Sequence, residues 1–107
     1  MDNENWIEGI AKENYDCFCD LYKKSALLRT NKKIVIFGAG VMGLQFSRIL
    51  EEFGERDYFF CDNDENKWTN HQKIAGKRIV GPEEIRNCAS SYFVFLAIEM
   101  YPDCATQ

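Results

Sequence analysis

The sequence lacks the features that would indicate a membrane or nucleic-acid function. It has 13 Lys and Arg against 17 Asp and Glu, a formal charge of −4, so it offers no basic field to nucleic acid or to an anionic membrane. The N-terminal residues have neither the basic nor the apolar region of a secretory signal. The longest apolar run, Tyr92 to Ile98, is too short to span a bilayer. We therefore expect a soluble, cytoplasmic protein that binds neither nucleic acid nor membrane.

Histidine is scarce, and the cysteines follow no recognisable framework. His71 is the only histidine and lies among polar residues, without a partner for a catalytic triad or a metal site. The 5 cysteines are an odd number, and reduced thiols are expected in a cytoplasm. Cys17 and Cys19 form a C-x-C pair, but no second pair completes a four-ligand metal set. We therefore expect no metal site and assign no catalytic residue.

The first part of the chain has the pattern of an amphipathic helix. From Asn3 to about Arg29, apolar residues recur at helical spacing, and Asp2 or Asn3 would cap the helix. We expect residues 1–31 to form an N-terminal amphipathic helix. Residues 32–107 would then form a Rossmann-like nucleotide-binding domain, truncated before the helix that should follow its last strand.

In this second part, strand-like and helix-like segments alternate. The predicted strands are 33–37, 57–61, 78–80 and 91–98, and the predicted helices are 41–53, a short turn at 65–68 and one that begins with Gly81-Pro82-Glu83-Glu84. This alternation is typical of an α/β fold with a parallel sheet and flanking helices. Right-handed crossovers would place the strands in the order 3-2-1-4, the first half of a doubly wound dinucleotide fold.

Three glycines lie between the first predicted strand and the next helix. Gly38, Gly40 and Gly43 fit the pattern G-x-G-x-x-G in this context. Gly38 would allow a tight turn, Gly40 would let the backbone approach a pyrophosphate, and Gly43 would let the helix pack close to the strand. The free N–H groups of Val41 and Met42 would face the phosphates.

An acidic segment ends the second predicted strand, where a ribose is normally bound. We expect Asp62 to accept hydrogen bonds from the ribose, with Asn63 beside it. An acid there repels a 2′-phosphate, and the nearest cation is Lys67, so NAD is expected over NADP. An empty fold is the alternative, because glycine-rich turns also occur in domains that have lost their ligand and Asp62 could simply cap the next loop.

The segments IVIFGAGVMG, FFCDNDENKW and IAGKRIVGPEEI together resemble a known kind of domain. They are similar to the Rossmann-like N-terminal domain of bacterial acyltransferases that act on UDP-amino sugars. They also resemble nucleotide-binding modules of glycosyltransferases and methyltransferases in surface-polysaccharide clusters. The resemblance covers roughly Lys33 to Ile98 and implies binding of NAD or a nucleotide sugar in bacterial polysaccharide biosynthesis.

This sequence departs from that family in ways that bear on activity. It has no hexapeptide repeat, which forms the catalytic β-helix of those acyltransferases. Gly81 precedes Pro82 where Ser is expected. We therefore expect a nucleotide-binding module that is not catalytic by itself and lacks the catalytic domain of its relatives.

Two other functions remain open at this point. One is a structural or dimerisation module with a vestigial nucleotide site. The other is an NAD-dependent oxidoreductase, which is disfavoured because no Tyr-x-x-x-Lys pair, catalytic histidine or substrate domain is visible. The N-terminal helix should cover the apolar strand at 91–98, either within its own chain or across a homodimer, which we favour.

Overall fold

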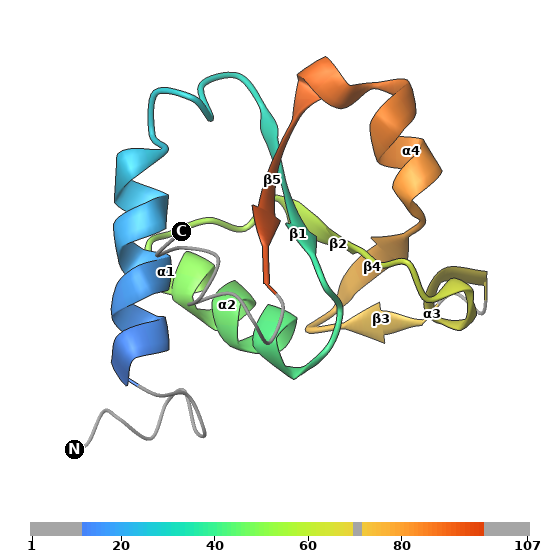
Figure 1. Ribbon diagram of the computed structural model, residues 1–107, viewed down its shortest axis with the longest axis horizontal. Helices are drawn as coiled ribbons and strands as arrows, with labels where there is room; N and C mark the ends of the chain where they lie inside the picture. Colours follow the sequence, from blue (N-terminus) through green and yellow to red (C-terminus); the bar gives the residue numbers. More distant parts are fainter. Residues whose placement is uncertain (1–11, 70–71, 98–107) are drawn as a thin grey trace.

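The fold is built on a five-stranded sheet. The structure is a computed structural model that describes residues 12–69 and 72–97. The strands are β1 (Lys33–Phe37), β2 (Tyr58–Cys61), β3 (Lys73–Ile74), β4 (Lys77–Val80) and β5 (Tyr92–Leu96). They lie in the order β3-β4-β2-β1-β5, with every pair parallel except β3 and β4 (Figure 1).

The four predicted strands lie in the predicted order, but the sheet is mixed rather than parallel. The predicted order 3-2-1-4 corresponds to β4-β2-β1-β5. The additional strand, β3, lies between the short turn predicted at 65–68 and the strand predicted at 78–80, where no strand was predicted. Ala75 and Gly76 both have positive φ, 54° and 76°, as a two-residue type I′ hairpin turn requires. This turn folds Lys73 and Ile74 back onto the start of β4.

The helices follow the predicted segments, with a correction at the first one. They are α1 (Lys12–Lys24), α2 (Val41–Glu52), α3 (Glu65–Thr69) and α4 (Pro82–Asn87), followed by the 3₁₀ helix η2 (Ala89–Ser91). The first helix ends at Lys24, not near Arg29, and its predicted caps Asp2 and Asn3 lie outside the described residues.

Two side chains at the end of α1 donate to one of its last carbonyl groups, that of Tyr22. The Ser25 hydroxyl donates to the Tyr22 carbonyl at 3.1 Å, and the Arg29 guanidinium donates to the same carbonyl at 2.6 Å and to Ser25 Oγ at 2.9 Å. Such side-chain bonds replace those of a further helical turn. Arg29 also faces Glu55 at 3.5 Å, which ties the end of α1 to the loop after α2.

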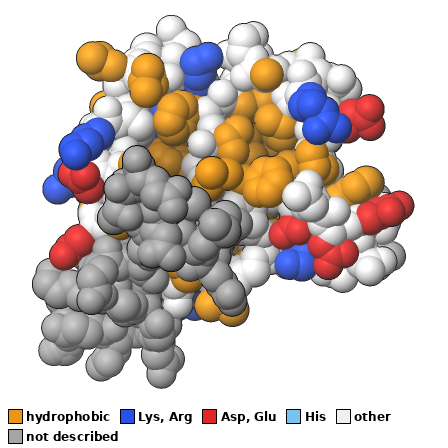
Figure 2. Space-filling model, viewed as in Figure 1, with side chains coloured by type: hydrophobic (Ala, Val, Ile, Leu, Met, Phe, Trp, Pro, Cys, Tyr) orange, Lys and Arg blue, Asp and Glu red, His pale blue; other side chains and the backbone are white. Residues whose placement is uncertain are grey.

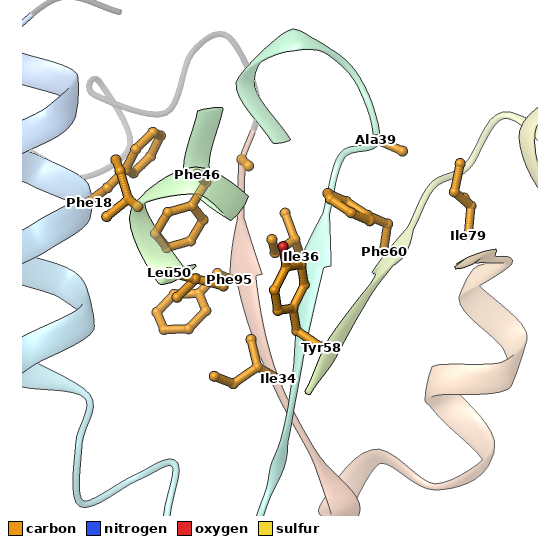
Figure 3. Packing of buried hydrophobic residues seen from close by; sticks show 12 residues of the cluster. Phe18, Ile34, Ile36, Ala39, Phe46, Leu50, Tyr58, Phe60, Ile79 and Phe95 are labelled. Atoms are coloured by element: carbon orange, nitrogen blue, oxygen red, sulfur yellow. The ribbon is translucent and has the colours of Figure 1, made fainter. Parts of the chain in front are cut away.

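The first face of the sheet carries the larger core, closed by α1 and α2 (Figure 3). Its buried residues are Phe18, Ile34, Ile36, Ala39, Phe46, Ile49, Leu50, Tyr58, Phe60, Ile79, Phe95 and Ala97. Phe46 of α2 stacks on Phe18 of α1 at 4.5 Å and meets Phe95 of β5 edge-on at 4.9 Å. The first helix therefore packs within its own chain, which is one of the two arrangements expected for it.

The second face of the sheet holds a smaller cluster. Its buried residues are Val35, Phe59, Cys61 and Val80, and Ile85 of α4 packs against them. Phe37 and Val94 on this face are only partly buried, and Leu96 is 45% exposed. Figure 2 shows hydrophobic side chains gathered at the surface in the region of β5. The homodimer stays a prediction, since the structure contains a single chain.

Within the described residues, none of the helices has both the length and the apolar character needed to cross a bilayer.

Candidate functional site

The three glycines lie at the edge of the sheet where the parallel strands end. Gly38 directly follows β1, and its N–H donates to the Cys61 carbonyl at the end of β2, at 2.8 Å. The Asp62 N–H in turn donates to Val80 at the end of β4, at 3.1 Å. In open α/β sheets, ligands bind outside the carboxyl ends of the strands. The glycine loop and the acidic segment therefore meet where such a ligand would bind.

Two of the three glycines are required by the fold itself. Gly38 has φ of +116°, a conformation that side chains strongly disfavour. A Cβ on Gly43 would lie 1.9 Å from the Gly38 carbonyl oxygen, so only glycine lets α2 start this close to the loop. Both roles agree with those predicted from the sequence.

Gly40 is different, because no described residue crowds it. Its backbone is extended, with φ of −113° and ψ of −150°, and a Cβ would meet no atom of the described residues within 4 Å. Gly40 is the N-terminal capping residue of α2, and no side chain of the described residues caps this helix. The position thus has open space in front of a helix terminus.

The first turn of α2 presents backbone N–H groups and no acidic side chain. Val41 is 72% exposed, whereas Met42 is partly buried against the first-face core. The first N–H groups of an α-helix have no acceptor within the helix, and they carry the positive end of its dipole. This arrangement suits an anion, as the sequence analysis predicted for Val41 and Met42.

Asp62 contacts the glycine loop directly. Its Oδ2 accepts a hydrogen bond from the Ala39 N–H at 2.7 Å, and its Oδ1 accepts one from the Asp64 N–H at 2.8 Å. The Lys67 ammonium lies 3.5 Å from Oδ2. Burial alone would raise the pKa of Asp62, but the two backbone hydrogen bonds and Lys67 together lower it below its ordinary value.

This geometry gives Asp62 a role in the fold, and its predicted role with ribose stays a prediction. A carboxylate offers about four acceptor positions, and the contacts to Ala39, Asp64 and Lys67 leave about one of them, on Oδ1. Asn63, the neighbouring predicted residue, is exposed in the loop that follows.

Lys67 is the site residue that the sequence analysis did not assign. Besides Asp62, its ammonium donates to the Ala39 carbonyl at 3.2 Å. The short helix predicted at 65–68 could have indicated this role, because a helical turn there brings Lys67 back toward Asp62. Sequence analysis used Lys67 only as the nearest cation to Asp62.

A pocket of about 300 Å³ lies beside Trp68 and is lined by residues of α3, β3, β4 and α4. Trp68, Gly81, Arg78 and Glu84 are among its lining residues. The Trp68 indole N–H donates to the Asp62 carbonyl at 3.0 Å, and a Cβ on Gly81 would lie 2.8 Å from the indole ring. Trp68 therefore both bonds to the backbone of Asp62 and lines the pocket. Its ring packs so closely on Gly81 that a side chain at position 81 would clash with it.

Of the cysteines and the histidine considered above, the structure describes Cys17, Cys19 and Cys61. Cys61 is fully buried in β2, and burial raises the pKa of its thiol to about 11, as expected for a packing residue rather than a nucleophile. Cys17 and Cys19 are partly buried on α1. His71 and Cys104 lie outside the described residues.

Comparisons of the chain with protein-family models, with curated proteins and with solved structures found no match.

Proposed function

We propose that this chain binds the diphosphate of a nucleotide, either NAD or a nucleotide sugar, at the N-terminus of α2. The observation that carries the proposal is Gly40. The fold itself explains Gly38 and Gly43, but the described residues give no steric reason for a glycine at position 40. Close approach of a diphosphate to the backbone is such a reason.

The local charge distribution supports a bound anion. The first turn of α2 has no acidic residue and no side-chain cap among the described residues, so its N–H groups are open to a ligand oxygen. The helix dipole adds a favourable field at the same point. Val41 and Met42 supply these N–H groups in the proposed complex.

The surroundings of the loop suit the rest of a nucleotide. Asp62 retains an acceptor position for a ribose hydroxyl, and Trp68, whose indole N–H donates to the Asp62 carbonyl, lines a neighbouring pocket. A base bound there would lie against the indole wall. Because the Asp62 carboxylate repels a 2′-phosphate, we expect NAD to bind more tightly than NADP.

We further propose that the chain acts as a non-catalytic module of a larger enzyme in glycan synthesis. This part rests on the resemblance to the N-terminal domains of UDP-amino-sugar acyltransferases and related polysaccharide enzymes. No residue of the site is assigned a catalytic role. The alternatives, an NAD-dependent oxidoreductase and a pairing module with a vestigial site, predict turnover and no ligand response respectively.

A thermal-shift screen with NAD, NADP, UDP sugars and CoA, followed by calorimetry on the ligands that respond, tests the proposal. Gly40→Val should remove binding while the variant still folds, because its Cβ meets no atom of the described residues within 4 Å. Val41→Ala is the control, since it changes an exposed side chain and leaves the backbone N–H in place. Equal affinity of Gly40→Val and the parent for every ligand would refute the proposed site.

A further inference from the structure

One residue of the glycine loop, Ala39, is held on both of its backbone polar groups by an ion pair. The Ala39 N–H donates to Asp62 Oδ2 at 2.7 Å, and the Ala39 carbonyl accepts from Lys67 Nζ at 3.2 Å. The two side chains face each other at 3.5 Å. The Lys67 ammonium therefore lies against the loop that precedes the N-terminus of α2.

The contacts of Lys67 are not needed to hold α3 in place. Trp68 already anchors this short helix through its bond to the Asp62 carbonyl and its packing on Gly81. The Lys67 side chain remains 31% exposed, and its two contacts are long for charge-assisted hydrogen bonds. An ammonium has three donors on a flexible stem, so one donor remains for a ligand.

A diphosphate at the proposed site would bring negative charge close to the carboxylate of Asp62. Like charges oppose each other, and without a cation this carboxylate would weaken binding. Lys67 offsets the charge of Asp62 and can also donate to a phosphate oxygen from the same place.

We propose that Lys67 is a specificity-determining residue, which donates to a diphosphate oxygen and thereby lets the site select nucleotides carrying a diphosphate over the corresponding nucleosides. This inference rests on the proposed function of the glycine loop. In this inference Lys67 interacts with the negative charge of the ligand, in addition to supporting the loop through Ala39.

The test uses NMR titration of the ¹⁵N-labelled full chain, which measures weak affinities and identifies the perturbed amides. ADP is compared with adenosine, and UDP with uridine. Lys67→Met should weaken binding of the diphosphates about tenfold or more, because it removes a charged hydrogen bond, and should change nucleoside binding by less than about twofold. Lys67→Arg keeps the charge and should retain most of the diphosphate affinity.

A double-mutant cycle with Asp62→Asn separates the two roles of Lys67. A loss that persists in the Asp62→Asn background supports direct donation to the ligand, because the carboxylate charge is then absent. A loss that disappears there overturns the inference, since Lys67 would act only by neutralising Asp62. Equal losses for nucleoside and diphosphate overturn it too, because Lys67 would then only hold the loop.

The failure of this inference can be distinguished from failure of the proposed function. If Gly40→Val removes diphosphate binding and Lys67→Met does not weaken it, the site stands and the role of Lys67 is refuted. If the parent chain binds none of the four compounds and also fails to bind NAD and UDP-glucose, both are refuted. Thermal unfolding of each variant shows that the compared proteins are folded.

Discussion

The two faces of the sheet differ in how completely they are closed. On the first face, α1 and α2 cover a continuous cluster. In it the ring of Phe46 contacts Phe18 on one side and Phe95 on the other. On the second face, the described helix that packs on the sheet is the six-residue α4, and Leu96 remains 45% exposed. The comparison indicates that the first face supplies most of the stability, while the second face is open to further contacts.

The glycine loop lies between these faces, at the edge where both end. Ala39 belongs to the first-face cluster, and Cys61 of the second-face cluster accepts the bond from Gly38. The first-face core thus supports the loop from one side, and the side chains of Asp62 and Lys67 hold its residue Ala39. A binding loop supported in this way needs little reorganisation when a ligand arrives.

The largest expected effect is on the free energy of unfolding, and it is tested by the same substitution on each face of the sheet. Phe46→Ala should lower the free energy of unfolding near the top of the range of about 3–5 kcal/mol that such changes give, because the ring is enclosed by other rings. Phe59→Ala on the second face should cost nearer the bottom of it. The side chains of Lys33 and Arg78 lie over the Phe59 ring and can move into the space left by its removal.

Urea unfolding of both variants at one pH measures this difference. A greater loss for Phe59→Ala than for Phe46→Ala would show that the second face is the more tightly packed one, contrary to the comparison.

The next effect concerns the loop between the faces. Gly43→Ala should destabilise the protein by about 1–3 kcal/mol, because the new methyl group would clash with a backbone oxygen that cannot move freely. Gly40→Ala should cost less, about 0.5–1 kcal/mol, because its methyl group meets no described atom and only the poorer N-cap preference of Ala remains. Thermal unfolding of the pair checks this, and a similar loss for both would mean that Gly40 also serves the fold.

Sequence reasoning predicted the regular parts of this molecule well. The strands at 33–37 and 78–80, the helix beginning at Val41 and the proline-led start of α4 all follow from local patterns of apolar, glycine and proline residues. The end of the helix predicted at 41–53 also follows from a local residue, Gly54. Its φ is +91°, and the Glu55 N–H bonds back to Leu50 at 3.1 Å, as in a Schellman motif.

The features that sequence reasoning missed depend on contacts between distant residues. The strand β3 is two residues long, too short to show a period, and it exists because of the turn at Ala75 and Gly76. The early end of α1 depends on the reach of Arg29 to Tyr22 and Glu55. No local pattern distinguishes these polar contacts from solvated side chains.

The same holds for the candidate site. The glycine spacing predicted the loop and the roles of Gly38 and Gly43, which are properties of backbone geometry. The bonds from Asp62 and Lys67 to Ala39 were not predicted, because they require the fold to bring α3 back over the loop.

A third test concerns the polar contacts that close the first face. Arg29→Lys should cost about 2 kcal/mol, because a lysine keeps the charge but cannot make the bonds to both Tyr22 and Ser25 with one planar group. The Arg29 side chain is 11% exposed, so solvent does not replace these bonds. Arg56→Lys, at an exposed position, is the matched control and should change stability little. Equal effects in urea unfolding would show that the Arg29 contacts do not hold α1.

The smallest expected effect is the pH dependence that Asp62 gives to stability. Because the folded state lowers the pKa of Asp62, its contribution is fully present above the unfolded-state pKa of about 4 and is lost as the pH falls through the folded-state value. Asp62→Asn should therefore lower the free energy of unfolding by about 1 kcal/mol at pH 7, since the amide cannot accept both backbone bonds. The difference from the parent should shrink as the pH is lowered from about 5 toward 3. Asp57→Asn, which removes a largely exposed partner of Lys33, should give a smaller difference at pH 7. A difference for Asp62→Asn that grows on acidification would mean that the carboxylate is strained rather than stabilised against the glycine loop.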